Sequence, residues 1–339
     1  MTGCRKTLLA IAALGAAGLV LVAAGGMTAR SEEKRWQAVA PGRIEACSGQ
    51  IKLGAVVAGV VDKVLVKAND RVFAGEPLIR LADGELAGRL SAAESQVALR
   101  KRARDEKSAT GRAGTLRKAR DARADADEKV YAVRAIVDRT AAEWRAKGGS
   151  SEALTKARSA LAGAKVELAK REEELQALED DAPLPTVLEG QLSIARSEYA
   201  VARSALDNMT VRAPADGTVL QVNVHAGESV SPGSPQPLLQ LADISALCVR
   251  AELDERDLAF VGMKQAVSVR AAASPDKELT GKVVSIAPLV GPGRMETSGP
   301  RNQSDVNVVE VMIELTETGQ SLTGMKVDVY FKPGETAGR

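Results

Sequence analysis

The residue types that perform most enzyme chemistry are scarce in this chain. It has one histidine, His225, and three cysteines, Cys4, Cys47 and Cys248. A lone histidine without a neighbouring ligand set indicates a surface residue rather than a metal ligand. The sequence contains no Ser/His/Asp or Cys/His set, no metal-binding cluster and no phosphate-binding loop. We therefore predict no catalytic, metal or cofactor site. Cys47 and Cys248 could pair in an oxidising compartment, but the simpler interpretation is two buried free thiols.

Composition points away from nucleic acid and from one large globular core. The 339 residues carry a net charge of +2, and aromatic residues make up 2% of the chain. The basic cluster 100–123 has no interleaved aromatic residues on which bases could stack. So few aromatics are typical of coiled coil combined with small β units.

The first thirty residues predict passage across a membrane. Leu8–Met27 is apolar and uncharged and follows Arg5 and Lys6, and twenty helical residues span a bilayer core. A cleaved signal peptide ending near Val22-Ala23-Ala24 is the alternative. Both interpretations place the rest of the chain on the far side of the membrane.

A long alanine-rich stretch, 84–209, carries nearly all of the helical pattern. Apolar residues recur with alternating spacings of three and four on either side of Gly148–Gly149, which is heptad spacing. We expect the chain to fold back there into an antiparallel hairpin, although two independent solvated helices remain an alternative. The predicted seam consists of Val130, Val133, Val137 and Trp144 on the first arm and Leu161, Leu168 and Leu175 on the second.

Charge and phase refine this hairpin. The basic run 117–123 falls level with the acidic run 172–181, which supports antiparallel pairing. The heptad phase is lost near Gly111–Gly114 and near Pro183–Pro185, two sites that face each other in the folded-back register. We therefore expect two arms of about 60 residues, or about 90 Å if fully helical, with a discontinuity at one level.

Two copies of one short β pattern flank the helices. Residues 58–83 and 216–243 share alternating apolar residues followed by a turn, at Asn69-Asp70 in the first copy and Gly227-Glu228 in the second. Asn and Gly tolerate the positive φ that such turns need. Each copy is too small to bury a face alone, so we expect the two to pair into one sandwich.

The chain after Asp243 predicts a small β-barrel. Five short strands alternate apolar and polar residues, Asp254–Leu258 indicates a helical turn with an acidic cap, and 291–305 is a polar loop. The stretch 36–45 could supply one more strand. The predicted fold class is thus α+β and elongated, with a coiled-coil hairpin inserted in a split sandwich and followed by a barrel.

The paired halves resemble the biotinyl/lipoyl domain split by an insertion. Carrier domains of that type present a lysine at the tip between the halves. Here no lysine lies between Lys67 and Lys101. We therefore expect no biotin, no lipoate and no carrier function.

The order of anchor, half sandwich, hairpin, half sandwich and barrel resembles the HlyD-like membrane fusion (periplasmic adaptor) family. The best local matches are Val64–Val72, Arg212–Gly217 and Glu252–Glu255. The resemblance implies a non-enzymatic subunit that links an inner-membrane transporter to an outer-membrane TolC-like channel. It also implies a homo-oligomer, commonly a hexameric ring, with the bulk of the chain in the periplasm and no nucleic acid bound.

Many family members carry an Arg, Leu, Ser pattern at the hairpin tip that contacts the channel. Arg139 and Ser150 stand at the matching spacing, and Leu154 fits a position after the serine, whereas the leucine position holds Glu143. The resemblance thus implies channel contacts at Arg139, Ser150 and Leu154. The basic run 100–112 faces little acid within the expected hairpin and could meet a neighbouring subunit.

The partner transporter is predicted from two local features. The barrel is followed closely by the end of the chain, where adaptors of resistance-nodulation-division pumps usually add a domain, and Ala40–Glu45 resembles adaptors of ABC exporters. An ABC-type exporter is favoured, with a major-facilitator or resistance-nodulation-division pump, or a structural coiled-coil envelope protein without a pump, as alternatives. The expected division is 1–29 anchor or signal, 30–50 linker and first barrel strand, 51–83 first half, 84–209 hairpin, 210–243 second half, 244–332 barrel and 333–339 tail.

Overall fold

The computed structural model describes residues 36–147, 151–180, 182–271, 273–293, 307–317 and 322–333. The predicted anchor at 8–27 lies outside these ranges. Within them, no helix has the length and apolar character that crossing a membrane requires.

The barrel is closed, with strand order β1-β10-β13-β12-β11-β14. Its strands are β1 (Ala38–Ala46), β10 (Leu247–Asp254), β11 (Ala266–Ala271), β12 (Ser274–Pro292), β13 (Asn307–Leu315) and β14 (Lys326–Phe331). Alternate residues point inward, because successive side chains of a strand face opposite sides. β1 pairs with β10 and β14 and closes the barrel, which confirms that the 36–45 stretch supplies a further strand.

The connection after β10 also matches its sequence. A 3-10 helix, η1 (Glu255–Phe260), follows the strand, and the Asp254 side chain accepts a hydrogen bond from the Arg256 backbone N–H at 3.0 Å. This confirms the acidic cap. β12 reaches Pro292, so Gly291 belongs to a strand and not to the loop expected there.

The two sequence copies build one sandwich of two sheets, β2-β9-β7-β4 and β6-β5-β3-β8. Each sheet takes two strands from the first half, 51–83, and two from the second half, 210–243, and both sheets cover one apolar core. Asn69 (φ 72°) and Gly227 (φ 87°) take the positive φ that their turns need. The strands are β2 (Ile51–Leu53), β3 (Gly59–Val64), β4 (Arg71–Val72), β5 (Pro77–Leu81), β6 (Thr210–Arg212), β7 (Gly217–Val222), β8 (Ser229–Val230) and β9 (Leu239–Ala242).

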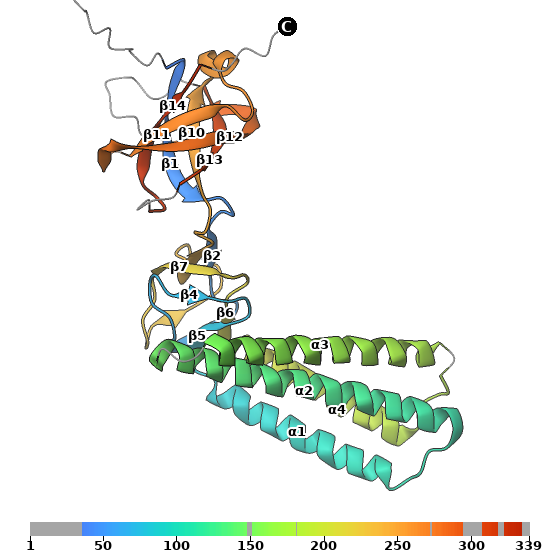
Figure 1. Cartoon of the computed structure of the whole chain (residues 1–339). Helices are drawn as coiled ribbons and strands as arrows, with labels where there is room; N and C mark the ends of the chain where they lie inside the picture. Colours follow the sequence, from blue (N-terminus) through green and yellow to red (C-terminus); the bar gives the residue numbers. More distant parts are fainter. Residues whose placement is uncertain are drawn as a thin grey trace, which may run out of the picture. The chain divides into compact units, whose positions relative to one another are not determined.

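The helical stretch is not one long hairpin. It forms four helices, α1 (Gly84–Asp105), α2 (Gly111–Lys147), α3 (Ser151–Glu179) and α4 (Val187–Asp207). Helix α1 packs along α4 and α2 packs along α3, and the four lie side by side (Figure 1). The discontinuity predicted at one level is thus confirmed. The prediction of two arms that extend for about 90 Å is wrong, because both arms bend back at that level.

The bends occur where the heptad phase is lost. On the first arm Gly111 takes φ +61°, and a Cβ on Gly114 would lie 2.6 Å from the Ala109 carbonyl oxygen. Only glycine permits this backbone path, so the chain turns sharply there. On the second arm Pro183 and Pro185 precede Thr186, which caps α4, and proline cannot continue a helix through its own position.

A disulfide joins Cys47 to Cys248 across 201 residues. Cys47 lies between β1 and β2 and Cys248 lies at the start of β10, so the bridge ties the two points where the chain passes between barrel and sandwich. The prediction of two buried free thiols is wrong. The sequence could not reveal the pairing, because only the register of β1 against β10 brings the two cysteines together.

Candidate partner-binding end of the helices

Helices α2 and α3 pair along the seam expected from the heptads. The side chains of Val130, Val133, Val137, Trp144, Leu161, Leu168 and Leu175 are all partly buried. Two ion pairs flank the seam, Arg120–Glu179 at 3.3 Å and Arg123–Glu172 at 2.9 Å. The opposite charges predicted to lie level with each other thus meet in the structure.

The turn end of this helix pair contacts the sandwich through aromatic rings. The Trp144 ring on α2 lies 6.2 Å from the ring of Phe73, which follows β4. The guanidinium carbon of Arg158, on α3, lies 4.3 Å from the centre of the Phe73 ring. Such a cation–π contact contributes about 0.5–2 kcal/mol, depending on how far it is desolvated. Phe73 is therefore held between the two helices.

Arg145 makes the polar part of this contact. Its guanidinium donates to a carboxylate oxygen of Glu76 and, at 3.1 Å, to the Leu65 carbonyl, and it lies 3.8 Å from Asp70. Glu76 is only 4% exposed. Burial raises the pKa of Glu76, while the Phe73 backbone N–H and Arg145 act in the opposite direction. Arg145 thus compensates a carboxylate that the sandwich buries.

The residues predicted to contact a channel lie at or near this same end. Arg139 is exposed, whereas Leu154 is only 4% exposed. Ser150 lies outside the described residues. Because the helices bend back, Trp144, Arg145 and Arg158 near this end lie against the sandwich. The prediction that this end of the helices is an exposed tip is therefore wrong. The contacts of Arg139, Ser150 and Leu154 with a channel remain a prediction.

A row of ion pairs, here called the arginine–aspartate ladder, joins the two helix pairs. It consists of Arg196–Asp121 (2.7 Å), Arg203–Asp127 (2.7 Å) and Arg134–Asp207 (3.0 Å) between α4 and α2, and of Arg212–Asp138 (2.9 Å) between β6 and α2. Partners are separated by 73 to 76 residues along the whole row. A nearly constant offset means that α4 runs parallel to α2 and in register with it.

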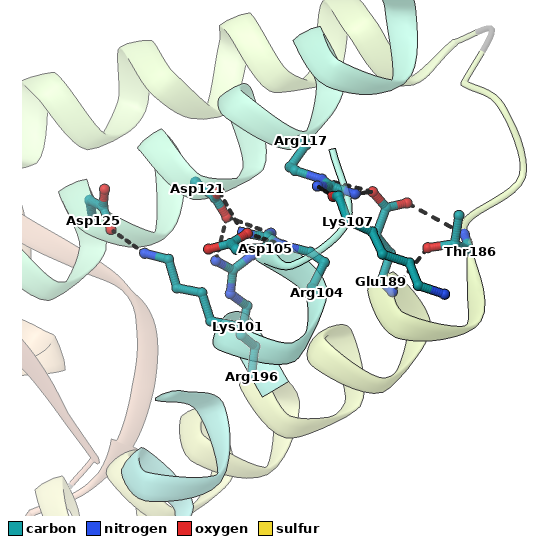
Figure 2. Close-up of polar contacts among 10 residues, drawn as sticks. All are labelled: Lys101, Arg104, Asp105, Lys107, Arg117, Asp121, Asp125, Thr186, Glu189 and Arg196. Carbon is teal, nitrogen blue, oxygen red and sulfur yellow. Dashed lines mark hydrogen bonds and ion pairs between the residues drawn. The ribbon is translucent and has the colours of Figure 1, made fainter. Parts of the chain in front are cut away.

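Asp121 has two arginine partners. It accepts hydrogen bonds from Arg196 and, at 2.9 Å through both carboxylate oxygens, from Arg104 on α1 (Figure 2). Burial favours the neutral form, but the hydrogen bonds from Arg104 and Arg196 outweigh it and lower the pKa of Asp121. The carboxylate therefore stays ionised between two guanidinium groups.

The basic run 100–112 is largely occupied within the chain. Arg104 is 2% exposed and pairs with Asp105 and Asp121. Lys101 lies 3.9 Å from Asp125 on α2. The expectation that this run is free to meet a neighbouring subunit is wrong for these two residues, because folding back brings the aspartates of α2 onto α1.

Aromatic rings line the middle of the ladder. The Arg203 guanidinium carbon lies 5.4 Å from the Tyr131 ring centre and 5.6 Å from that of Tyr199. Arg203 thus contacts two rings as well as Asp127. Its hydrogen bonds to Asp127 and the nearby negative charge raise its pKa although burial acts against this.

A second polar cluster lies at the bends. Glu189 and Thr186 form a capping box at the start of α4, in which each side chain accepts from the other's backbone N–H. Arg117 of α2 donates to Glu189 at 3.0 Å and to the Lys107 carbonyl at 2.8 Å (Figure 2). Beside it lies a cavity of about 740 Å³, lined from α1, α2, α3 and α4 and both bends. The helix pairs are thus bridged by long polar side chains around an open space.

Sequence reasoning missed Phe73, Glu76, Arg145 and the ladder. A signal for the ladder was present, since α2 and α4 carry opposite charges at a repeated offset of about 74 residues. The predicted continuous hairpin concealed it, because in that geometry α4 pairs with α1 and never meets α2. Phe73 and Glu76 carry no signal in the sequence, because their role depends on where α2 ends.

The described residues also do not meet the requirements of a metal site. In the described ranges no group of three or more His, Cys, Asp or Glu side chains could hold a metal ion. His225, the one histidine, has a side chain that is 90% exposed, as expected for a surface residue.

Comparisons with known proteins show what the chain is similar to. No protein-family model matches the chain. The UPF0194 membrane protein YE2891 of Yersinia enterocolitica is 28% identical over 83% of this chain and 86% of its own length. The macrolide export protein MacA of Yersinia pestis is 30% identical over 37% of this chain and 35% of its own length. The crystal structure of MacA from Actinobacillus actinomycetemcomitans, at 20% identity, covers 86% of this chain and 77% of that chain with a TM-score of 0.49.

The order of elements in the chain agrees with the resemblance drawn from its sequence. A barrel strand comes first, and a helical insertion separates the two halves of the sandwich. The similarity to an export protein and to a membrane protein is consistent with the resemblance of the chain to the HlyD-like membrane fusion proteins, the periplasmic adaptor family.

Proposed function

We propose that the protein is the adaptor subunit of an export system and acts by binding rather than by catalysis. It joins an inner-membrane transporter to an outer-membrane channel of the TolC type. The observation that carries this proposal is the split sandwich, whose halves are continuous with the barrel on one side and the helices on the other. A spacer protein without a transporter has no need of this unit.

An ABC-type exporter is the proposed transporter. The resemblance of Ala40–Glu45 to adaptors of ABC exporters supports this class, and the similarity to a protein named for macrolide export supports export in general. In this proposal residues 8–27 anchor the chain in the inner membrane and the β units and helices occupy the periplasm. Several copies, by analogy a hexamer, surround the transport path.

The proposed channel contacts are Arg139, Ser150 and Leu154. Arg139 is exposed on α2 and lies off the seam, so reversing its charge leaves the α2–α3 pairing intact. We expect Arg139→Asp to reduce export and channel crosslinking strongly while expression and subunit assembly stay normal. Lys129→Asp is the matched control, since Lys129 is an exposed cation further along the same helix.

The test of the function is affinity purification of the tagged protein from crosslinked membranes. Recovery of a permease with an ATPase, together with an outer-membrane channel, is the expected result. A major-facilitator or resistance-nodulation-division pump in place of the ABC exporter would correct the transporter class. Recovery of the chain without any transporter would contradict the adaptor function and leave a structural envelope protein.

The sandwich is also proposed to carry no cofactor. Its first half has no lysine between Lys67 and Lys101, and the place of a carrier lysine is taken by the helical insertion. We expect the intact mass of the protein to show neither biotin nor lipoate. A lysine bearing either group would contradict this assignment.

A further inference from the structure

The helices pack more closely within each pair, α1 with α4 and α2 with α3, than the two pairs pack against each other. Backbones of α1 and α4 approach each other along their length, as do those of α2 and α3, whereas backbones of different pairs approach far less. The space between the pairs is bridged by long side chains, most of them arginines. Each pair is therefore a unit of its own, and the contact between the pairs is a separate, looser one.

The faces that meet between the pairs are charged. The ladder pairs Arg196–Asp121 and Arg203–Asp127 have side chains about one fifth exposed, and a cavity of about 740 Å³ lies beside the bends. Separating an apolar interface would expose apolar surface to water. Separating this interface exposes arginines and aspartates, which water solvates well. Apart from the rings of Tyr131 and Tyr199 around Arg203, opening this interface thus exposes mainly polar side chains.

Both connections between the pairs lie at the same end. One runs through residues 106–110 to Gly111, and the other from Glu179 through Pro183 and Pro185 to Thr186. Leu184, in the second connection, is 94% exposed. Because the two connections lie at one level, changes of backbone angle within them would let α2 and α3 rotate together.

The other end of α2 and α3 is the end held against the sandwich. Phe73, Arg145 and Arg158 make this contact, and Leu154 is covered there. We propose that the structure is a stowed state, in which the α2–α3 pair is folded back against the sandwich and the arginine–aspartate ladder holds it closed. Opening at the two bends swings α2 and α3 out as a rigid pair and releases their turn end.

Opening restores the continuous hairpin that the heptads predict. The seam between α2 and α3 is unaffected, because its residues lie within the rotating pair. The turn end travels far, since 29 residues of α3 correspond to about 43 Å and a half-turn about the bends moves that end by about twice this length. If the proposed function is right, the stowed state keeps the turn end of α2 and α3 from a channel until assembly; the motion itself does not depend on that function.

The test measures the distance between the turn end and the sandwich in the full-length protein in detergent. Dyes are placed on Ala68→Cys and Ala146→Cys, two exposed positions beside the Asp70–Arg145 contact. Cys4 is replaced by serine, and the Cys47–Cys248 disulfide is kept oxidised. Single-molecule energy transfer is then high in the stowed state and absent when α2 and α3 swing out.

The decisive variant neutralises the ladder with Asp121→Asn, Asp127→Asn and Asp138→Asn. We expect the open fraction to rise by about fivefold for each pair removed, with helical circular dichroism unchanged because both helix pairs persist. The matched control neutralises as many acids within the rotating pair, Glu167→Gln, Glu172→Gln and Glu179→Gln, and leaves the transfer as in the unmodified protein.

Three outcomes would overturn the proposal. Unmodified protein without a high-transfer population would mean that the stowed state is not its resting state. High transfer that survives the three aspartate substitutions would mean that the ladder does not hold the pair closed. Loss of helical signal together with loss of transfer would mean that the pair unfolds rather than rotates. Each result is obtained without a transporter or channel, so it is independent of whether the adaptor function is correct.

Discussion

In the barrel, apolar side chains from every strand meet in one core, whereas the helices meet one another mostly through charge. Val249, Ile313 and Phe331 are fully buried between the strands. In the described helices seven apolar side chains are buried, and four of them are alanines, so little apolar area holds the helices together. Burial of apolar area stabilises by about 25 cal/mol per Å², while ion pairs of the helices whose side chains are about one fifth to one half exposed contribute less. The barrel is thus built to keep one arrangement, and the helices are built to allow more than one.

The two tryptophans report on these two regions separately. Trp36 stacks on Tyr330 of the barrel with ring centres 5.2 Å apart, and Trp144 stacks on Phe73 at the end of α2. The chain has no other tryptophan. Replacing one of them by phenylalanine leaves fluorescence that follows the other region alone, which makes each comparison below measurable.

The largest expected effect is in the barrel. Phe331→Ala removes a fully buried ring, and a cavity of that kind costs about 3–5 kcal/mol. We expect the denaturant midpoint followed by Trp36 to fall accordingly. Leu289→Ala is the control, because Leu289 is 75% exposed and its truncation should leave the midpoint unchanged. Equal effects of the two substitutions would mean that the barrel core is not where the stability lies.

The second largest effect is expected from removing the Cys47–Cys248 disulfide, which ties the two points where the chain passes between barrel and sandwich. Replacing Cys47 and Cys248 by serine removes a bridge that closes a loop of about 200 residues, which should lower the free energy of unfolding by about 2–4 kcal/mol. A reductant should lower the thermal midpoint of the unmodified protein and leave that of the double variant unchanged. A reductant effect that persists in the double variant would show that another thiol is responsible.

The third effect concerns the buried carboxylate of Glu76. Burial raises its folded-state pKa above 4.5, so its ionised form destabilises the folded chain at neutral pH and Arg145 offsets this. Arg145→Ala should therefore cost about 1–3 kcal/mol near pH 7. The cost should shrink as the pH falls through the raised pKa and Glu76 takes up a proton.

Thermal melts followed by Trp144 between pH 4.5 and 7.5 measure this dependence. Lys129→Ala is the control, as an exposed cation on the same helix. A cost of Arg145→Ala that is the same at every pH would show that Glu76 is not the group that Arg145 compensates.

The smallest effect separates the two kinds of ion pair in the helices. Glu172→Gln breaks a half-exposed pair and should cost about 0.2–1 kcal/mol. Asp121→Asn should cost more, because it leaves the buried Arg104 without its main carboxylate. The pKa of Asp121 is lowered below 3.8, so its contribution is present above that value and is lost as the pH falls through the lowered pKa. Urea titrations at pH 7 and pH 3 compare the two variants.

Local patterns in the sequence predict the β units well. The paired turns at Asn69 and Gly227, the cap at Asp254 and the extra strand near Ile44 are all present, because each depends on neighbours a few residues away. The two breaks in the helices were also visible, at Gly111 and Pro183. The sequence did not reveal that the chain folds back at these breaks, because the same heptads are compatible with a straight hairpin and with a folded one.

The folded arrangement depends on contacts between distant residues. Asp121 meets Arg196 only if α2 and α4 run parallel, and Arg145 meets Glu76 only if α2 ends at the sandwich. The sequence around each of these residues contains no repeating pattern that predicts its contact. The disulfide is of the same kind, because the strand register that joins Cys47 to Cys248 involves the first and the last thirds of the chain.

The Cys47–Cys248 disulfide also determines whether proteolytic fragments of the chain stay covalently joined. Residues 48–247 form a covalent ring that contains the whole sandwich and all four helices. A protease that cleaves the bend at 181–186 therefore yields two fragments that remain one molecule until a reductant is added. The most exposed segments of the helices can thus be nicked without releasing either half of the sandwich from the barrel.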